Sequence, residues 1–434
     1  MDFTRKHAGS QNRRMRFHST RSGSQLLVLS EAIGQSIAPD GGLYVPEIFP
    51  TFNAEDFAGL NSWNEIGKRL LEPFFRDDDL QNHLSEICDE AFNFPITFDF
   101  LNNETAVLEL FHGPTAAFKD VGARFLAACV ARMPGRRTII VATSGDTGGA
   151  VAAAFAERSN VDVIILFPQE KISARQQQQL TCWGDNVRAF AVRGVFDDCQ
   201  RIVKTAFANR EWSERRGLLS ANSINVGRLL PQIVYYAASS LWYFRQRNAR
   251  PGYIIPTGNL GNAVAAFWTQ EMSLPIREIV LATNRNRTLP DYFQTGEWSP
   301  QQTIPTLANA MDVGNPSNFE RLQNLYPEIA NLRTIARAFS VSDEEISQTI
   351  VNGIDRWGQV WCPHTATAVH VRERLIEPDW IIVATAHPAK FDSIVEPLIK
   401  QTIPTPPALT AVLERPSRFE KIEPTFEALA QTLL

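Results

Sequence analysis

The sequence predicts an α/β protein built on parallel sheets. Its 434 residues exceed what one ordinary core holds, so two or three packed units are expected. Short apolar runs alternate with helical stretches, and continuous apolar strands of this kind are typical of parallel sheets covered on both faces. The predicted strands lie at 138–143, 161–167, 187–192, 253–257, 277–283 and 379–385. Amphipathic helices are predicted between them, for instance over 196–209 and 228–247.

The chain before residue 101 differs in character from the rest. We expect residues 1–14 to be a disordered basic extension, residues 15–100 a small N-terminal helical domain, and residues 101–434 the main α/β region of two interleaved subdomains. The first 24 residues hold six Lys and Arg residues against one Asp. An Arg-rich and acid-poor start is also typical of an organelle transit peptide, and this alternative stays open.

Composition and charge exclude several classes of protein. The net charge is -5 and the isoelectric point about 5.9, which points to neither nucleic acid nor an anionic membrane as partner. No apolar run approaches the roughly 20 residues needed to cross a bilayer. The cysteines form no CxxC pair, so we expect no metal site, reduced thiols and a cytoplasmic location. They are Cys88, Cys129, Cys182, Cys199 and Cys362.

The most informative stretch is FHGPTAAFKDVGAR at 111–124. Gly113 and Pro114 force a bend, and apolar residues at helical spacing follow, so Lys119 stands where a bend enters a partly buried helix. Burial lowers the pKa of a lysine, which a Schiff-base nucleophile requires. The ordinary alternative is a lysine whose stem packs on the surface while its amine reaches water.

Two further stretches, 138–150 and 253–262, each read as a buried strand, a glycine turn and a helix. This order aims backbone N–H groups at one point and predicts an anion site. Neither stretch is a Walker A loop or a GxGxxG fingerprint, so a nucleotide is not favoured.

Seven stretches occur in the order found in one known family: LELFHGPTAAFKDVGARF, ATSGDTGGAVAAAF, LFPQEKIS, SANSINVGRLLPQIVYY, PTGNLGNAVAA, TLANAMDV and VATAHPAKF. Over residues 108–391 the chain thus resembles threonine synthases, in their bacterial and fungal branch. The resemblance implies pyridoxal 5'-phosphate as cofactor. It also implies a fold type II enzyme of the tryptophan synthase β group, with two parallel-sheet α/β domains and a small N-terminal helical domain. In this family Met15 would be the usual start.

The resemblance assigns cofactor contacts residue by residue. Lys119 would bond to the cofactor aldehyde and then carry protons, and Thr385 would face the pyridine nitrogen. Asp146 would lie beside the phenolic oxygen, where it would be protonated or need a cationic neighbour. A helix N-cap is its alternative role, and a structural role is favoured for His387. The cofactor phosphate would be held by Gly258, Asn259, Leu260, Gly261 and Asn262, with a plain glycine turn as the alternative.

The resemblance also implies two substrate contacts. The α-carboxylate would meet Thr143, Ser144, Gly145 and Thr147. A second anion pocket for the substrate phosphate is expected at SANSINVGR, chiefly from Asn222, Ser223 and Arg228, because a guanidinium fork suits phosphate. Ser220 and Asn225 belong to the same stretch, and Lys171 and Arg175 are second-choice cations. The alternative is a capped loop that binds nothing.

The reaction implied is the conversion of O-phospho-L-homoserine and water to L-threonine and phosphate by a β,γ-replacement. A phospho-lyase that releases 2-oxobutyrate would use the same residues and stays open. A β-replacement enzyme such as cysteine synthase is disfavoured by the FHGPTAAFKD and TAHPAKF motifs. A cofactor-binding regulatory protein without turnover is the alternative from another class. We expect a small phosphorylated amino acid as substrate and a monomer or homodimer.

Overall fold

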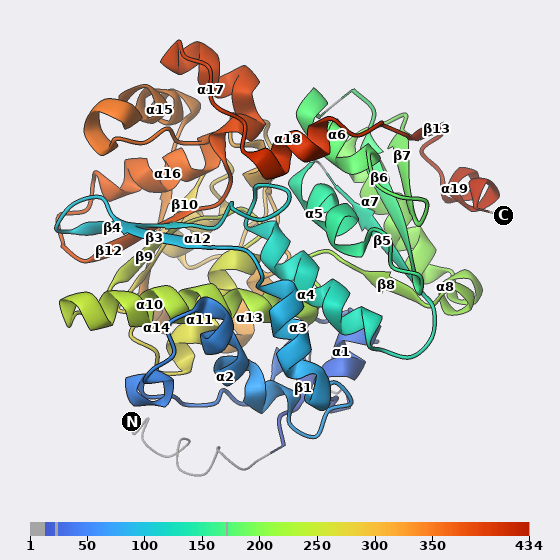
Figure 1. Cartoon of the computed structure of the whole chain (residues 1–434), viewed down its shortest axis with the longest axis horizontal. Helices are drawn as coiled ribbons and strands as arrows, with labels where there is room; N and C mark the ends of the chain where they lie inside the picture. The colour runs from blue at the N-terminus through green and yellow to red at the C-terminus, as the bar shows by residue number, and fades with distance from the viewer. Residues whose placement is uncertain (1–13, 22–24, 144, 171, 434) are drawn as a thin grey trace.

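The computed structural model describes residues 14–21, 25–143, 145–170 and 172–433, which form two α/β units with an N-terminal segment packed below them (Figure 1). The larger sheet runs in the order β11 (Ala336–Ser340), β10 (Ile279–Thr283), β9 (Gly252–Pro256), β12 (Trp380–Ala384), β4 (Thr105–Glu109) and β3 (Thr97–Phe100). All neighbours in it are parallel except β3 and β4.

The smaller sheet is parallel throughout. Its order is β13 (Glu420–Ile422), β7 (Val187–Val192), β6 (Val161–Pro168), β5 (Arg137–Ala142) and β8 (Leu218–Ser220). The six strands predicted from sequence are confirmed as β5, β6, β7, β9, β10 and β12. The prediction missed β3, β4, β8, β11 and β13, most of which lie toward the sheet edges.

Alternate residues of each strand enter different hydrophobic cores, because successive side chains point to opposite faces of a sheet. In β9, Tyr253 and Ile255 join a central core, while Ile254 joins an outer core. In β5, Ile139 joins the central core and Ile140 a third one. The central core therefore lies between the two sheets and unites them.

The helices sort by the core that they cover. The central core is covered by α1 (Leu29–Gln35), α2 (Trp63–Phe75), α3 (Leu84–Ala91), α4 (Lys119–Ala131), α5 (Asp146–Phe155), α6 (Ala174–Thr181), α9 (Val226–Leu229), α10 (Ile233–Arg247), α11 (Gly261–Glu271), α12 (Thr288–Thr295), α13 (Phe319–Leu325) and α14 (Ile329–Leu332). The outer face of the larger sheet is covered by α15 (Asp343–Trp357), α16 (Pro363–Arg372), α17 (Asp392–Ile399) and α18 (Pro407–Leu413). The outer face of the smaller sheet is covered by α7 (Phe196–Ala208), α8 (Arg210–Arg216) and α19 (Phe426–Thr432).

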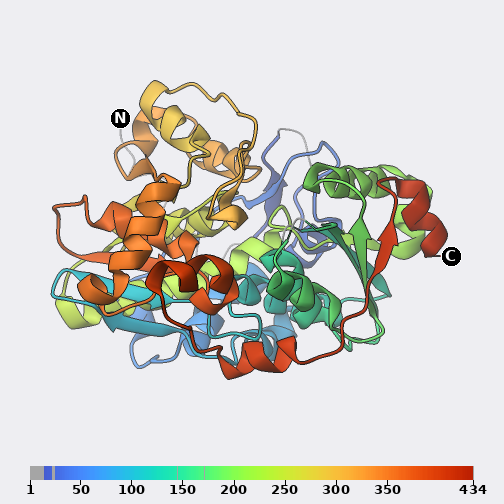
Figure 2. The same cartoon turned by 90° about the horizontal axis from the view of Figure 1, so that it is seen from above.

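One sequence prediction about helices needs correction, and the C-terminal chain joins both units. The stretch 228–247 is not one helix: a 3₁₀ turn at Leu230–Gln232 separates α9 from α10, because Pro231 cannot donate a backbone hydrogen bond. The Pro-rich chain from Thr402 also contains regular structure. It forms α18, crosses to the smaller unit and adds β13 beside β7 before α19 (Figure 2).

The N-terminal segment is helical but also holds the antiparallel pair β1 (Phe17–Ser19) and β2 (Tyr44–Pro46). Its apolar residues join the central core, so it has no separate core of its own among the described residues. The predicted boundary at residue 100 falls inside the larger sheet, because β3 pairs with β4. The predicted extension 1–14 lies outside the described residues except for Arg14. Within the part described, no helix is long and apolar enough to span a membrane.

Candidate active site

Four of the segments singled out by sequence follow the carboxyl ends of parallel strands. The stretch leading to Lys119 follows β4, Asp146 follows β5, the loop 258–262 follows β9, and Thr385 follows β12. In open α/β sheets, ligands bind at this edge. We call residues 258–262 the phosphate loop from here on.

Lys119 is the first residue of α4. The carboxylate of the next residue, Asp120, stabilises the bend that precedes the helix. Asp120 accepts hydrogen bonds from the backbone N–H of Thr115 at 2.9 Å and from its hydroxyl at 2.7 Å. Gly113 has no room for a side chain, since an added Cβ would lie 2.6 Å from the Asp120 carboxylate. The Phe118 N–H donates to the Thr385 carbonyl at 2.8 Å. This bond brings the lysine and the end of β12 together.

The amine of Lys119 lies near one buried carboxylate that a second lysine also contacts. Asp146 Oδ2 is 3.9 Å from Lys119 Nζ, and Asp146 Oδ1 is 2.9 Å from Lys390 Nζ. Lys390 is 1% exposed and donates a further hydrogen bond to the Thr115 carbonyl at 2.7 Å. Lys390 is thus a cationic neighbour of Asp146, in a role that the sequence did not assign to it. Asp146 is not the N-cap of α5, because Gly145 holds that position.

Burial and charge set the protonation of this cluster. Burial lowers the pKa of Lys119; Asp146 opposes this effect, and the charges of Lys390 and Arg228 reinforce it. Burial alone would raise the pKa of the Asp146 carboxyl, but the charges of Lys390 and Lys119 outweigh burial and hold that pKa below its usual range. The site therefore combines an ionised carboxylate with a lysine that is more easily deprotonated than usual, which favours nucleophilic amine chemistry.

The turn before α5 is held by its own threonine. Thr143 Oγ1 accepts from the N–H groups of Gly145 at 3.0 Å and Gly148 at 2.9 Å, so this hydroxyl braces the turn. Gly145 has φ +146°, which favours glycine, and an added Cβ would lie 2.5 Å from the Gln176 amide. Thr147 is partly exposed in the first turn of α5. Ser144 lies outside the described residues.

The phosphate loop leads into α11 with Leu260 at a left-handed N-cap, φ +63°. The first helical hydrogen bond is donated by Val264, and the four preceding N–H groups have no acceptor in the described chain. The hydroxyls of Tyr235 and Tyr236 both lie 2.6 Å from Asn262 Oδ1, and the buried Asn262 Nδ2 has no partner. Asn259 differs, because its amide is already bonded within the protein.

Gly258 completes the loop at a close approach of two backbones. An added Cβ there would lie 2.7 Å from the backbone of Met311. Free N–H groups, an unpartnered amide and a tight glycine are features that suit a phosphate. A lysine for the aldehyde and this cradle for the phosphate are the donor set that pyridoxal phosphate needs, so the residues present fit that cofactor.

Thr385, 5% exposed, adds a hydroxyl that has no partner within the described chain. Its N–H donates to Thr365 Oγ1 at 3.2 Å, at the start of α16. His364, one residue earlier, is buried and accepts from the Ala310 N–H through Nε2. Sequence reasoning missed Thr365 and His364, and CPHTAT offers only a proline helix start as a signal. His387 caps a 3₁₀ turn, in accord with a structural role.

The segment 220–228 connects the two glycine turns. Asn222 Nδ2 donates to the carbonyl of Ala142 at the end of β5, at 3.4 Å, while Ser223 contacts the phosphate loop. Arg228 is 4% exposed, lies against Gly122 of α4, and keeps a buried Nε without a partner. Burial lowers the pKa of Arg228 to about 10, with Asp120 opposing, so the guanidinium is charged at neutral pH.

The other described candidates for binding the substrate phosphate, Arg175, Ser220 and Asn225, each form contacts within the protein. Arg175 forms an ion pair with Asp392 at 3.0 Å, which occupies its guanidinium. Asn225 is the N-cap of α9. Ser220 accepts a hydrogen bond from the Asn222 N–H. Lys171 lies outside the described residues.

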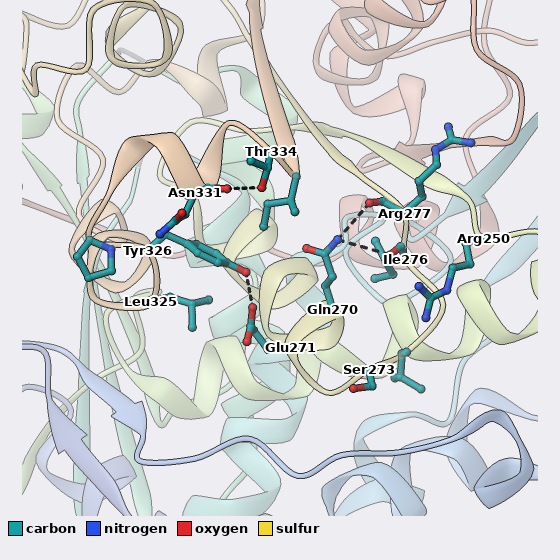
Figure 3. A pocket seen from close by; sticks show the side chains of 13 residues that line it. Arg250, Gln270, Glu271, Ser273, Ile276, Arg277, Leu325, Tyr326, Asn331 and Thr334 are labelled. Atoms are coloured by element: carbon teal, nitrogen blue, oxygen red, sulfur yellow. Dashed lines mark hydrogen bonds between the residues drawn. The ribbon is translucent and has the colours of Figure 1, made fainter. Parts of the chain in front are cut away.

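A cavity of about 800 Å³ lies elsewhere in the larger unit (Figure 3). Its lining includes Gln270 and Glu271, at the end of α11 opposite the phosphate loop. An 11-residue helix spans about 16 Å, so this cavity is separate from the cluster around Lys119. Tyr326 closes one side by donating to Glu271 at 2.6 Å.

Three family models match the chain and together cover most of it. A pyridoxal-phosphate dependent enzyme model matches residues 102–385. A model of the threonine synthase N terminus matches residues 16–92, and one of the threonine synthase C-terminal region matches residues 365–433. The cofactor class and the fold of the α/β region predicted from sequence are thereby confirmed.

Relatives and solved structures agree over nearly the whole length. The chain is 35% identical to threonine synthase of Serratia marcescens, covering 97% of this chain and 99% of that protein. A pyridoxal-phosphate-bound threonine synthase from Brucella melitensis superposes with TM-score 0.90 at 32% identity, covering 96% and 98% of the two chains. The Escherichia coli threonine synthase structure gives TM-score 0.88 at 33% identity, covering 96% and 99%. This chain belongs to the threonine synthase family of pyridoxal-phosphate dependent enzymes.

Proposed function

We propose that this chain converts O-phospho-L-homoserine and water to L-threonine and phosphate, with Lys119 as its catalytic residue. The observation that carries the assignment of roles is the arrangement around the largely buried amine of Lys119. Lys119 lies beside an ionised carboxylate, and the segment 220–228 links it to two places suited to anions: the phosphate loop and Arg228. A phosphorylated cofactor and a phosphorylated substrate require two such places.

The proposed role of each residue follows from the donor or acceptor group that has no partner within the described chain. The phosphate loop and Asn262 Nδ2 would hold the cofactor phosphate, Lys119 would bond to the aldehyde, and the Thr385 hydroxyl would serve the pyridine nitrogen. Asp146 stays ionised beside the lysine. When bound, pyridoxal phosphate withdraws electrons from the carbons next to the substrate nitrogen and so makes their protons acidic.

Once the substrate is bound, the Lys119 amine would carry protons to and from it. Because burial lowers its pKa, this amine gives up its proton more easily than an ordinary lysine, which suits it to take the proton from Cα and later return a proton to the substrate chain. The fixed N-terminus of α4 holds the amine in position for these transfers.

The substrate anions would be bound by the two turns. Gly145 and Thr147, at the start of α5, are suited to the α-carboxylate because a helix N-terminus favours negative charge. Arg228, with its free Nε, is suited to the phosphate that leaves from Cγ, assisted by Asn222. Thr143 supports the carboxylate turn from behind instead of touching substrate.

Product analysis tests the reaction. The loaded protein is incubated with O-phospho-L-homoserine and every product is identified by NMR. Phosphate with one equivalent of L-threonine is the expected result. Phosphate with 2-oxobutyrate and ammonia would identify a phospho-lyase instead, and absence of turnover would remove the substrate assignment.

A variant tests the lysine. Lys119→Ala is expected to abolish both turnover and reductive trapping of the cofactor by borohydride, while Lys68→Ala, at an exposed ion pair with Asp89, serves as control. A cofactor still trapped covalently in Lys119→Ala would refute the assignment.

We also propose a division of the chain into an N-terminal helical part and a catalytic α/β region, with the predicted boundary at residue 100 moved to a point before β3, which belongs to the larger sheet; the separate family models for 16–92 and 102–385 support two parts. The substrate is a small molecule. A cytoplasmic location is supported by five free, buried cysteines. We propose a monomer or homodimer, which sedimentation would decide.

A further inference from the structure

Arg321, in α13, is a fully buried arginine behind the phosphate loop. It is 0% exposed. Its Nε donates to the Tyr44 carbonyl at 3.1 Å, and Nη2 donates to the Ile224 carbonyl at 2.7 Å. Its Nη1 donates to the Ser223 carbonyl at 2.9 Å and to Asn318 Oδ1 at 2.6 Å. All four acceptors are neutral, and no carboxylate in the described residues forms an ion pair with this guanidinium.

The charge of Arg321 is therefore not compensated within the protein. Burial lowers its pKa to about 9 and Glu320 opposes this, so the guanidinium remains protonated at neutral pH. The Glu320 carboxylate is itself paired with Arg21 at 3.0 Å. A buried cation without an opposite charge is strongly unfavourable, so this site favours an anion that the chain does not supply.

The hydrogen bonds of Asn318 lead from Arg321 to the phosphate loop. Asn318 accepts from Arg321 and donates through Nδ2 to the Asn259 carbonyl at 3.0 Å and to Ser223 Oγ at 3.0 Å. Asn259 Nδ2 also donates to Ser223 Oγ, at 2.8 Å. The chain 321–318–259 thus fixes both the loop and the serine.

The Ser223 hydroxyl can still donate one hydrogen bond but can accept no more. Its oxygen accepts two hydrogen bonds, which fills both lone pairs, and its O–H has no acceptor in the described chain. The side chain lies against Gly261, where an added Cβ would be 3.2 Å from Ser223 Cβ. The hydroxyl therefore stands beside the free N–H groups that open α11.

We propose that Arg321 and Asn318 are positioning residues that orient the Ser223 hydroxyl as a donor to a phosphate monoester on the phosphate loop, with Arg321 as its buried counter-charge. This inference rests on the proposed function. It moves Ser223 from the substrate phosphate, where the sequence interpretation placed it, to the cofactor phosphate. A hydrogen bond to a charged group is among the stronger ones in proteins, so its loss is measurable in binding.

The test compares ligands with and without the phosphate. Dissociation constants of pyridoxal phosphate and of pyridoxal are measured by absorbance on the full-length protein freed of cofactor. Ser223→Ala is expected to reduce the preference for pyridoxal phosphate about tenfold, and Arg321→Met at least as much, with pyridoxal binding unchanged. In ³¹P NMR the phosphate pKa of the bound cofactor is expected to rise in Arg321→Met, because the dianion loses a positive neighbour.

A second buried arginine is the matched control. Arg372 is 6% exposed but pairs with Glu104 at 3.3 Å and donates to Thr105 at the amino end of β4. Arg372→Met removes a comparable buried side chain far from the carboxyl ends of the strands. The phosphate preference is expected to stay as in the parent.

The outcomes separate this inference from the function on which it rests. A parent protein without preference for pyridoxal phosphate over pyridoxal would overturn the phosphate loop and the inference together. A parent preference that Ser223→Ala leaves intact would overturn the inference alone, even where Arg321→Met does not fold. A Ser223→Ala effect seen only in the KM for phosphohomoserine would show that the serine serves the substrate site, and it would also overturn the inference. Inorganic phosphate that competes with pyridoxal phosphate less effectively in Ser223→Ala than in the parent would support the inference.

Discussion

Replacing Lys390 by methionine is expected to raise the pKa of Lys119. Both amines contact the Asp146 carboxylate, at 2.9 Å and 3.9 Å, so they lie at most about 9 Å apart. Two unit charges at that distance and an effective dielectric constant of 20 repel by about 2 kcal/mol, which corresponds to somewhat more than one pKa unit. Without Lys390 this repulsion disappears and the Asp146 charge is left to Lys119 alone, so both changes favour the ammonium form.

The assay reads the amine directly. Protein freed of cofactor is acetylated in competition with a reference amine across the pH range, and the reactivity of Lys119 is followed by peptide mass spectrometry. In Lys390→Met the midpoint is expected about one pH unit higher than in the parent, with the reactivity at a fixed lower pH reduced about tenfold. Cofactor capture should slow in parallel, because only the neutral amine attacks an aldehyde.

Matched variants isolate the charge from the packing. Lys390→Arg keeps the charge and is expected to leave the Lys119 midpoint near that of the parent. Asp146→Asn combined with Lys390→Met removes one charge of each sign and is expected to shift it less than Lys390→Met alone. A midpoint that stays constant or moves to lower pH in a folded Lys390→Met protein would show that the cluster is not coupled as its distances imply.

Three further predictions concern stability and reactivity. Gly122→Ala places a Cβ 2.4 Å from the Arg228 carbonyl oxygen, so urea unfolding should show a loss of about 2 kcal/mol, whereas Gly184→Ala, with its nearest atom at 3.6 Å, should be neutral. All five cysteines are buried and burial raises the pKa of Cys88 to about 12, so a disulfide reagent such as DTNB should label thiols only after unfolding. Burial lowers the pKa of His364 to about 4, with Asp146 opposing. Between pH 6.5 and 4 the unfolded state takes up a proton that the folded state does not, so stability should fall by about 2 kcal/mol from pH 7 to pH 5, and by less in His364→Gln.

The fold was predictable where local pattern and burial agree. Strands such as β6 and β12 lie inside their sheets and are apolar on both faces, so their sequences are apolar runs, which only Asp162 near the start of β6 interrupts. By contrast, β11 (Ala336–Ser340) and β13 (Glu420–Ile422) are edge strands with partly or largely exposed side chains, and nothing in their composition distinguishes them from loops. Their pairing depends on chain that is distant in sequence, which a local pattern cannot show.

The candidate site likewise consists of residues that local sequence patterns indicate and of contacts that such patterns cannot show. Lys119 and the phosphate loop were found because a bend and two glycines are local signals. The pairing of Lys390 with Asp146 joins residues 244 positions apart, and the bonds of Arg321 reach Tyr44 and Ser223. These contacts arise only when the two units and the N-terminal segment pack together.

The buried charges around the site favour ligands with more than one negative charge. Lys390, Arg228 and Arg321 carry positive charge, and Lys119 adds to it when protonated. Asp146, whose pKa the neighbouring lysines hold low, and Asp120, beside Arg228, are carboxylates that oppose them. Removing charges from water is unfavourable unless opposite charge is close, so this excess of cations destabilises the protein freed of ligands. A phosphorylated cofactor supplies one dianion and a phosphorylated substrate another. Arg228, next to the lysine, and Arg321, behind the phosphate loop, divide the excess between the two places where those dianions would lie, which explains why one arginine alone would not serve both.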